Sequence, residues 1–296
     1  MTLEDIIIIG AGPAGLAASI QLKRYGCNPL IFERDEVGGL LRNANWVENY
    51  LGFPAGIAGT DLVQLFKQQA ERISVRIFFE EVVKLDYKRR VFQVFTRSQV
   101  FQSRVAVIAT GTRPGLLKDF VIPETLRDRI AYEIYPLLHL EGQHVVIIGA
   151  GDAAFDYALN LCKKNVITIL NRTNQVKCLP LLWERADASS NIEYCPQTRI
   201  LKLTSMPNQQ MMIECDCPGG NCTIIADYLI GAIGREPRLD FISPSLFKKT
   251  SELEELGLLY FIGDVKNSAY RQTAIAAGDG LLAAMKIYRF LKESTQ

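Results

Sequence analysis

The sequence predicts an α/β protein of two doubly wound domains, each a parallel sheet between layers of other elements. Three observations predict this fold class. The apolar, β-branched runs 6–9 and 145–148 are typical of strands buried on both faces. Each run leads directly into a glycine-rich turn, and a helical apolar pattern follows it. Gly10 and Gly149 open the two turns and lie 139 residues apart, so the chain repeats one unit.

Composition excludes several classes of protein. The 296 residues include 33 basic and 32 acidic side chains, which gives no basic excess for nucleic acid or a membrane surface. No apolar run approaches the roughly 18 residues of a membrane span, and no signal-peptide pattern opens the chain. We therefore expect a cytoplasmic protein. Its seven cysteines are then thiols, or a redox or metal site, rather than a secreted disulfide framework.

The first unit has the pattern strand, glycine turn, helix, strand, acid, which is the dinucleotide-binding fingerprint. Gly10 permits the tight turn, Gly12 lets a pyrophosphate approach the backbone, and Gly15 lets the helix pack closely on the strand. The helix, ending near Gly26, directs its N-terminus at the phosphates. Glu33 closes the strand 30–32 and is placed to accept hydrogen bonds from ribose hydroxyls. The alternative is an ordinary turn between a strand and a helix.

The next elements complete this domain. Gly38 and Gly39 suit a backbone that passes close to a ligand, and the long loop 43–59 suits a functional segment. Thr60 is expected to cap a helix that ends near Arg72. An antiparallel excursion of short strands follows, before a buried strand at 105–109. The short strands are expected at 76–79, 81–86, 91–96 and 100–101.

The second unit begins after a crossing at 113–115. Its strand 145–148 precedes the turn 149–154, a helix over 155–162 and a strand over 166–170. That strand ends at Asn171 rather than at an acid, so Arg172 and Lys177 could meet a 2′-phosphate; the alternative is solvated surface charge. The return crossing lies near 234–237, and a strand at 258–262 and a helix over 274–291 follow. We expect the domains 1–112 plus 242–296 and, inserted in the first, 113–241.

The chain resembles the low-molecular-weight thioredoxin reductases and their flavoprotein relatives over nearly its whole length. The motifs that carry the resemblance are Gly10–Gly15, Gly38-Gly39, 48–54 (Glu-Asn-Tyr-Leu-Gly-Phe-Pro), 109–111 (Ala-Thr-Gly), 149–154, Gly263-Asp264 and Tyr270-Arg271-Gln272. The resemblance implies two Rossmann-like domains of the thioredoxin reductase type, FAD in the first, NADPH in the second, and a homodimer.

The resemblance also implies site residues. Asp264 would bind the ribityl chain of FAD, Arg271 and Gln272 would lie along the flavin ring, and Asn49 would lie near it. The expected FAD residues are Gly10, Gly12, Pro13, Ala14, Gly15, Glu33, Arg34, Gly39, Leu40, Asn49, Val82, Thr110, Gly111, Asp264, Arg271, Gln272 and Thr273. The expected NAD(P) residues are Gly149, Gly151, Asp152, Ala153, Arg172 and Lys177. No metal ligands are expected.

The chain departs from the family at its redox disulfide. Thioredoxin reductases carry Cys-x-x-Cys shortly before the second glycine turn, and those positions are Tyr132 and Tyr135 here. No cysteine lies between Cys27 and Cys162. Since a tyrosine cannot exchange disulfides, the usual route from flavin to thioredoxin is absent, and the catalytic group would be the flavin itself. The two tyrosines either pack near the flavin or are core and interface residues.

A second departure concerns nucleotide selection. The family's His-Arg-Arg-x-x-x-Arg reads Asn171-Arg172-Thr173 followed by Lys177. Lysine gives a point charge without the bidentate fork of arginine. NADPH, NADH and the absence of any nicotinamide cofactor therefore stay open, with ferredoxin or another electron carrier as a possible partner.

Cys215, Cys217 and Cys222 lie within the segment 214–222, around the turn of an expected hairpin. Cys217 and Cys222 flank the turn and could oppose each other in a disulfide. The alternatives are a zinc site, although the spacing is not a standard one, and a turn with incidental cysteines.

Three functions follow from these patterns. The first is an FAD-dependent oxidoreductase that passes electrons from NAD(P)H or a protein donor to an acceptor without an internal disulfide, as ferredoxin–NADP reductases of this fold do. The second is a disulfide reductase that uses Cys215, Cys217 and Cys222 or an external disulfide. The third is a non-catalytic flavin-binding sensor or partner module.

Overall fold

The computed structural model describes residues 3–293 and divides into two compact units. Unit 1 runs to Arg42, comprises Val47–Arg113, and resumes at Glu236; unit 2 comprises Asn43–Trp46 and Pro114–Arg235. The division between Arg235 and Glu236 lies within the return crossing expected at 234–237, and six residues before the domain boundary expected at 241/242. The short segment Asn43–Trp46 was expected in the first domain, and the structure assigns it to unit 2.

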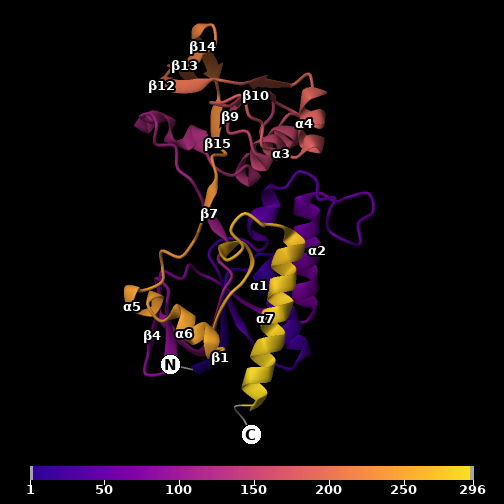
Figure 1. Cartoon of the computed structure of the whole chain (residues 1–296), viewed down its shortest axis with the longest axis vertical. Helices are drawn as coiled ribbons and strands as arrows, with labels where there is room; N and C mark the ends of the chain where they lie inside the picture. The colour runs from indigo at the N-terminus through magenta and orange to yellow at the C-terminus, as the bar shows by residue number, and fades with distance from the viewer. Residues whose placement is uncertain (1–2, 294–296) are drawn as a thin grey trace. The chain divides into compact units, whose positions relative to one another are not determined.

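Unit 1 is built on a seven-stranded sheet of order β3-β2-β1-β6-β5-β4, with β17 beside β6 (Figure 1). The strands β3, β2, β1, β6 and β17 run parallel, whereas β5 pairs antiparallel with both β6 and β4. The strands are β1 Leu3–Ile9, β2 Leu30–Glu33, β3 Arg76–Phe79, β4 Lys84–Lys88, β5 Val91–Phe95, β6 Val100–Ile108 and β17 Leu259–Phe261.

The central strand β1 is buried on both faces, as its unbroken apolar run predicts. Ile6 and Ile8 point into one apolar core, and Ile7 and Ile9 into a second core on the opposite face. The first core includes residues of α1 (Pro13–Arg24) and α7 (Thr273–Glu293), and the second includes residues of β4, β5 and α5 (Pro244–Phe247). Unit 1 therefore has the three-layer, doubly wound architecture that the sequence predicts.

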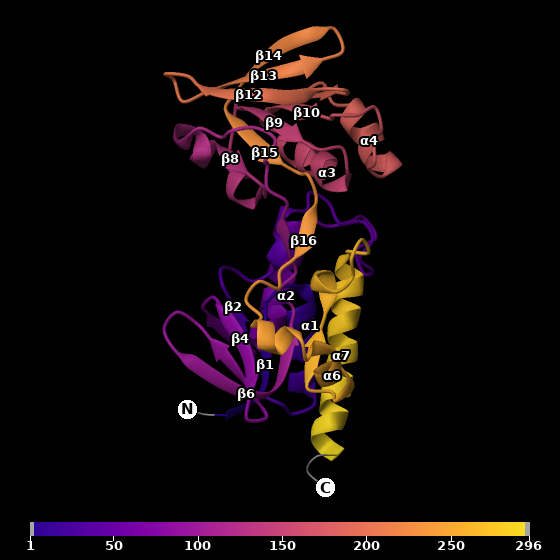
Figure 2. The ribbon, with the colours of Figure 1, turned by 60° about the vertical axis from the view of Figure 1, so that its left-hand side comes forward.

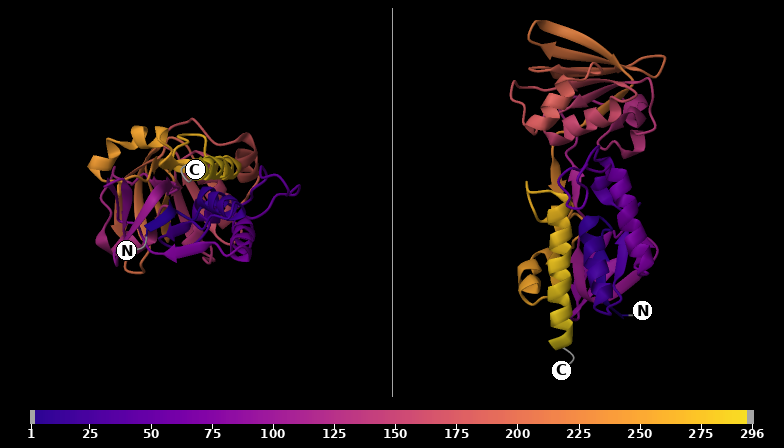
Figure 3. Two further views of the ribbon diagram at one scale, coloured as in Figure 1. Left: turned by 90° about the horizontal axis from the view of Figure 1, so that it is seen from below. Right: turned by 90° about the vertical axis from the view of Figure 1, so that its right-hand side faces the viewer.

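The helices of unit 1 come from both ends of the chain. The helix α7 lies alongside α1, and β1 begins and α7 ends at the same end of the unit (Figure 3). Tyr25 and Tyr288 stack with ring centroids 4.3 Å apart. The helices are α1 Pro13–Arg24, α2 Gly59–Arg72, α5 Pro244–Phe247, α6 Thr250–Glu255 and α7 Thr273–Glu293, with 3-10 turns η1 Gly39–Asn43 and η4 Gly263–Val265.

Unit 2 repeats the theme with a five-stranded parallel sheet of order β11-β10-β9-β15-β8. The helices α3 and α4 cover one face, and the antiparallel sheet β12-β13-β14 covers the other (Figure 2). The strands are β8 Ile130–Ala131, β9 His144–Ile148, β10 Val166–Leu170, β11 Ile192–Cys195, β12 Arg199–Ser205, β13 Met211–Cys217, β14 Gly220–Ala226 and β15 Tyr228–Gly231. The helices are α3 Asp152–Leu161 and α4 Pro180–Asp187, with 3-10 turns η2 Glu124–Arg129 and η3 Tyr135–Leu137.

The segment Asn43–Trp46 is tied into unit 2 by hydrogen bonds. The buried Asn43 accepts at Oδ1 from the backbone N–H groups of Ile134 and Tyr135, at 3.0 and 2.8 Å. The N–H of Asn45 donates to Asp156 on α3 at 2.9 Å. The two crossing segments, β7 Thr112–Pro114 and β16 Arg235–Pro237, pair with each other as a two-stranded sheet.

The structure corrects several expected elements. The strand 76–79 pairs parallel to β2, so it extends the main sheet and is not part of an antiparallel excursion. The expected strands 100–101 and 105–109 are one strand, β6, whose first half pairs with β5 and whose second half pairs with β17. The helix α2 begins at Gly59 without a side-chain cap from Thr60, and α3 begins at Asp152 rather than 155.

Candidate functional site

In the glycine turn of unit 1, Gly10 and Gly15 pack closely against backbone atoms, whereas Gly12 is open to a ligand. Gly10 has φ +108°, and a Cβ there would stand 2.4 Å from the carbonyl oxygen of Ala109. A Cβ on Gly15 would stand 2.0 Å from the carbonyl oxygen of Gly10, so α1 packs on the strand only with glycine there. At Gly12 no protein atom lies within 4 Å of the Cβ position, which leaves room for a ligand at the N-terminus of α1.

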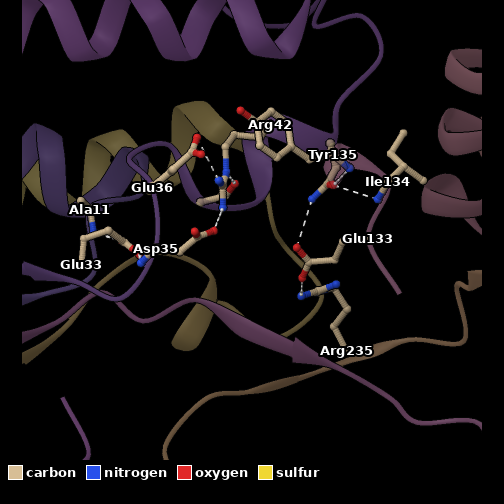
Figure 4. Close-up of polar contacts among 11 residues, drawn as sticks. Ala11, Glu33, Asp35, Glu36, Arg42, Glu133, Ile134, Tyr135 and Arg235 are labelled. Atoms are coloured by element: carbon tan, nitrogen blue, oxygen red, sulfur yellow. Dashed lines mark hydrogen bonds and ion pairs between the residues drawn. The ribbon is translucent and has the colours of Figure 1, made fainter. Parts of the chain in front are cut away.

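Glu33 holds this turn in place. Its Oε2 accepts from the N–H of Ala11 at 2.8 Å, and its Oε1 accepts from the N–H of Asp35 at 3.1 Å (Figure 4). The side chain is buried and lines a small cleft of about 60 Å³. Since each carboxylate oxygen can accept a second hydrogen bond, Glu33 can orient the turn and still accept from a ribose hydroxyl.

Five of the expected FAD residues line this cleft, together with several residues that the sequence did not identify. Gly10, Glu33, Arg34, Val82 and Thr110 line it, together with Ile9, Phe32, Glu80, Glu81, Arg238 and Phe241. Thr110 Oγ1 donates to the carbonyl of Arg238 at 2.8 Å, and Arg238 pairs with Glu81 at 2.5 Å. The expected boundary at 241 assigned Arg238 to the other domain, which is why it was missed.

A second group surrounds the Gly38-Gly39 turn. The N–H of Gly38 donates to the carbonyl of Ala11 at 2.9 Å, so this turn lies against the glycine turn of α1. Arg42 reaches back to Asp35 at 2.9 Å and Glu36 at 3.4 Å, as Figure 4 shows. Gly39 and Leu40 open η1 beside Gly12, where a Cβ on Gly39 would lie 3.4 Å from the Gly12 Cα.

The third group lies before α7. Asn49 Nδ2 donates to Gln272 Oε1 at 2.9 Å, which joins two residues that are 223 positions apart. Asp264 lies in η4, and Thr273 is the first residue of α7. The side chain of Asp279 accepts from the N–H of Gly263 at 3.0 Å and from Asn267 at 2.6 Å. Asp279 therefore shapes the turn that carries Asp264, and no sequence motif had singled it out.

The residues of unit 1 fit FAD. The open Cβ position at Gly12, the helix N-terminus beside it and the carboxylate of Glu33 provide room and hydrogen bonds for a dinucleotide. Of the expected FAD residues, Gly10, Glu33, Arg34, Val82 and Thr110 line the cleft. Gly12, Gly39 and Leu40 lie around the Gly38-Gly39 turn, and Asn49, Asp264, Gln272 and Thr273 lie in the group before α7.

The glycine turn of unit 2 repeats this construction. A Cβ on Gly149 would lie 2.4 Å from the carbonyl oxygen of Ala232, whereas a Cβ on Gly151 would meet no atom within 4 Å. The turn is braced by the following loop, because the N–H of Lys177 donates to Ala150 at 2.8 Å. Asp152 accepts from the N–H of Leu179 at 2.8 Å, which gives this expected ligand residue a role in holding the loop. Ala153 is exposed on the first turn of α3.

The turn opens into a pocket of about 570 Å³. Gly149, Gly151, Arg172 and Lys177 line it as expected, and so does Arg199, which sequence reasoning missed. Lys118 lines the pocket as well, and all four cationic residues are exposed. Such a cluster at the end of β10 suits a phosphate group, and it fits the 2′-phosphate of NADP(H).

Backbone pairing brings Arg199 beside Arg172. The N–H of Thr198 donates to the carbonyl of Asn171 at 2.9 Å, and the N–H of Gln197 donates to Thr173 at 3.3 Å. The side chain of the buried Asn171 stabilises the same loop, with its Oδ1 accepting from the N–H of Thr173 at 3.1 Å. No local signal could have found Arg199, because its neighbourhood is created by the parallel pairing of β10 and β11.

Tyr132 and Tyr135 have structural contacts within unit 2. The hydroxyl of Tyr132 accepts from the N–H of Leu117 at 3.1 Å, and its ring lies where a Cβ on Gly231 would stand. The backbone N–H of Tyr135 is one of the two held by Asn43. Between them, Glu133 pairs with Arg235 at 2.9 Å, as Figure 4 also shows.

Cys217 and Cys222 form a disulfide, with Cα atoms 6.2 Å apart. The sequence suggested that these two cysteines oppose each other across the hairpin, but the register does not place them directly opposite. Cys222 faces Cys215, and Cys217 faces Gly220. Burial, with a smaller contribution from the nearby Cys195, raises the pKa of the free Cys215 thiol to about 11. Within residues 3–293 no group of three or more acidic, histidine or cysteine side chains is arranged to hold a metal ion.

The sequence profile of the pyridine nucleotide-disulphide oxidoreductase family matches residues 4–280. The chain belongs to this family. It is a thioredoxin reductase-like, FAD-dependent oxidoreductase, and the cofactors of this family are FAD and NADPH.

Curated relatives and solved structures agree over the full length. The chain is 27% identical to the thioredoxin reductase of Mycolicibacterium smegmatis, with 99% of this chain and 98% of the relative covered. It is 28% identical to the bifunctional thioredoxin reductase/thioredoxin of Mycobacterium leprae, covering 99% of this chain and 67% of that protein. The crystal structure of Lactococcus lactis thioredoxin reductase shares the fold, with a TM-score of 0.87 at 24% identity, covering 98% and 99% of the two chains.

Across the helices that the structure describes, none has the length and apolar character to cross a membrane.

Proposed function

We propose that the chain transfers electrons from NADPH, bound in unit 2, through FAD, bound in unit 1, to an acceptor that meets the flavin directly. This proposal rests mainly on the absence of any cysteine between Cys27 and Cys162, where the family resemblance places a redox pair. Tyr132, at the expected position of one redox cysteine, supports this proposal. Its hydroxyl accepts a hydrogen bond from Leu117 and its ring packs against Gly231, so the side chain has structural contacts. In this respect the enzyme would resemble ferredoxin–NADP reductases, with ferredoxin or another carrier as acceptor.

When bound, FAD supplies the hydride and electron chemistry, and the protein supplies binding and orientation. Gly10, Gly12 and the start of α1 would hold its pyrophosphate, with Glu33 on the ribose. Asp264 and the Asn49–Gln272 pair would hold the opposite end of the cofactor.

The pocket of unit 2 would hold NADPH. Gly149 and Gly151 would accommodate the pyrophosphate, and Arg172, Lys177 and Arg199 the 2′-phosphate. The three cations would compensate for the arginines that are missing from the family's pattern. NADH, which has no 2′-phosphate, would leave them unused and would bind more weakly.

An anaerobic titration tests this function. The purified holoprotein is titrated with NADPH and, separately, with NADH while the visible flavin band is followed. We expect NADPH to bleach the band at lower concentration than NADH. A flavin that dithionite reduces but neither nucleotide bleaches would remove the nicotinamide site from the proposal.

A second candidate is the reduction of an external disulfide, and the names of the two thioredoxin reductase relatives favour it. The two candidates are separated by the acceptor. Stoichiometric oxidation of NADPH by an oxidised thioredoxin, unchanged in a C217S/C222S double variant, would favour an external disulfide. Reduction of ferredoxin or quinones without reduction of thioredoxin would favour the direct acceptor.

The chain is expected to act as a homodimer. The exposed Ile275, Leu282 and Met285 form an apolar stripe on α7 that a second copy could cover. Sedimentation of the holoprotein tests this expectation, and a monomer at micromolar concentration would contradict it.

A further inference from the structure

Three cysteines gather on one face of the hairpin β13–β14, close to its tip. Cys215 and Cys217 are two residues apart on β13 and therefore point to the same face. Cys222 lies directly opposite Cys215 in the register of the two strands. This face packs inward, since Met211, Ile213 and Cys215 are buried and alternate with partly or fully exposed neighbours.

The same apolar cluster includes Cys195, at the end of β11. Four of the seven cysteines in the chain thus lie in one cluster of unit 2. Cys215 belongs to its fully buried core, whereas Cys195, Cys217 and Cys222 are partly buried. The disulfide therefore lies at the edge of the cluster, where a thiol from solution can reach it.

The disulfide stabilises this hairpin less than a disulfide that closes a long loop would. Only four residues separate Cys217 from Cys222, and closing so short a loop restricts the unfolded chain weakly. Seven cross-strand pairs already join β13 to β14, and β12 pairs with the far side of β13. Because this pairing holds the hairpin independently of the disulfide, the bond can be broken and reformed while the hairpin stays intact.

Cys215 faces the disulfide but does not compete for it. Its side chain is fully buried, and burial raises the pKa of its thiol to about 11. The thiolate is the attacking form in disulfide exchange, so a thiol held protonated at neutral pH reacts slowly. The pairing of Cys217 with Cys222 is therefore kept, although Cys215 is the residue directly across from Cys222.

We propose that Cys217 and Cys222 are a reversible two-electron redox site of unit 2, whose substrate is an external thiol. A thiolate of the donor attacks one sulfur of the disulfide, which forms a mixed disulfide and releases the other cysteine as a thiolate that takes up a proton. A second donor thiolate then attacks the donor's sulfur, releasing the oxidised donor disulfide and the second cysteine. Two donor thiols are oxidised to one disulfide, and Cys217 and Cys222 gain two electrons and two protons.

The redox state of Cys217 and Cys222 can be measured in a single tryptic peptide. Residues 203–235 lie between Lys202 and Arg235 and contain Cys215, Cys217 and Cys222 but no other cysteine. The holoprotein, purified without reductant, is equilibrated in its native state with glutathione buffers of graded ratio or with reduced thioredoxin. It is then denatured, alkylated and analysed by mass spectrometry.

We expect one alkyl group on this peptide in the oxidised protein, at Cys215, and three after reduction. A species with two alkyl groups should occur only as the mixed disulfide, with the donor attached to the third cysteine. Reduction by glutathione assigns a low-molecular-weight thiol as donor, and reduction by thioredoxin alone assigns a protein dithiol. Three alkyl groups before any reductant is added, or one group under every donor condition, would overturn the proposal.

Two variants check the assignment of the pair. C215S should keep the transition, with none and then two alkyl groups, whereas C222S should show two groups under all conditions. Loss of the transition in C215S would overturn the assignment. The site does not depend on the flavin chemistry proposed above, so bleaching of the flavin by NADPH should be unchanged in C217S/C222S.

Discussion

At the residue scale, Asp156 shows how a single carboxylate couples stability to pH. Burial raises its pKa to about 6, against the opposing effects of the Asn45 N–H and the charge of Lys163. Because the folded-state pKa lies above the unfolded value, the ionised form is the one that folding disfavours. The contribution of Asp156 to the stability of the fold is therefore fully present below about pH 4 and is lost as the pH rises through about 6.

Replacing Asp156 with asparagine should remove this penalty. The amide oxygen can still accept from the Asn45 N–H, which lies 2.9 Å from the present carboxylate. At pH 7.5 we expect the free energy of unfolding of D156N to exceed that of the parent by on the order of 2 kcal/mol. The variant should therefore unfold at a higher temperature. The difference should shrink toward pH 4.5 in scanning calorimetry. A variant that is less stable at pH 7.5 would contradict the assignment.

Arg199 provides a second test at this scale. The exposed guanidinium shares the unit 2 pocket with Arg172 and Lys177, so R199A should weaken NADPH binding about ten-fold, or roughly 1.4 kcal/mol. Binding of NADH should change little. Lys202 is a matched control, because it lies on the same strand and pairs with Glu214. Equal effects of R199A on both nucleotides, measured by tryptophan fluorescence, would remove Arg199 from selection.

At the scale of elements, the contact between α1 and α7 depends on small residues. A Cβ on Gly280 would stand 2.2 Å from the carbonyl oxygen of Ala14 and 2.9 Å from the N–H nitrogen of Ala18. Since these are backbone atoms, the helices would have to separate. A Cβ on Gly263 would likewise meet Ala14, at 2.8 Å. The last helix is therefore held directly against the helix that carries the glycine turn.

The substitution G280A should lower the melting temperature by several degrees and weaken retention of FAD. The physical reason is that alanine forces α7 away from α1 at the turn where the pyrophosphate would bind. The control is G278A on the same helix, where a Cβ meets no atom within 4 Å. That variant should be neutral or gain up to about 1 kcal/mol from helix propensity. Equal behaviour of the two variants would rule out the close contact.

Elements with strong local patterns could be predicted from the sequence. The alternation of Ile6–Ile9 between two cores and the turns at Gly10 and Gly149 followed from apolar runs and glycine spacing. The parallel pairing of β3 could not, because its four residues carry the same pattern in either direction. The start of α2 at Gly59 overrode the capping preference of Thr60.

The site divides in the same way. Residues in sequence motifs, such as Glu33 and Gly151, could be identified from their spacing. Arg199, Arg238 and Asp279 could not, because each reaches its place through pairing or packing between distant segments.

At the scale of the whole molecule, unit 2 is assembled from two separate stretches of chain. Asn43 lies far from Ile134 in sequence, yet it accepts the N–H groups of Ile134 and Tyr135. We expect N43A to leave these donors without an acceptor and to cost about 2 kcal/mol locally. Hydrogen exchange of residues 130–138 should accelerate, whereas the exposed N28A control should leave it unchanged. Unaltered exchange in N43A would show that this anchor is dispensable.

The placement of α7 beside α1 bears on how the chain is made. The core of unit 1 joins β1, near the start of the chain, to β17 and α7, near its end. During synthesis most of unit 2, Pro114–Arg235, leaves the ribosome before those partners exist. The nascent chain would therefore carry a folded second unit while the first still waits for its last helix. Capture of the flavin then has to follow the synthesis of α7, so a chain that meets a shortage of FAD would already contain both units.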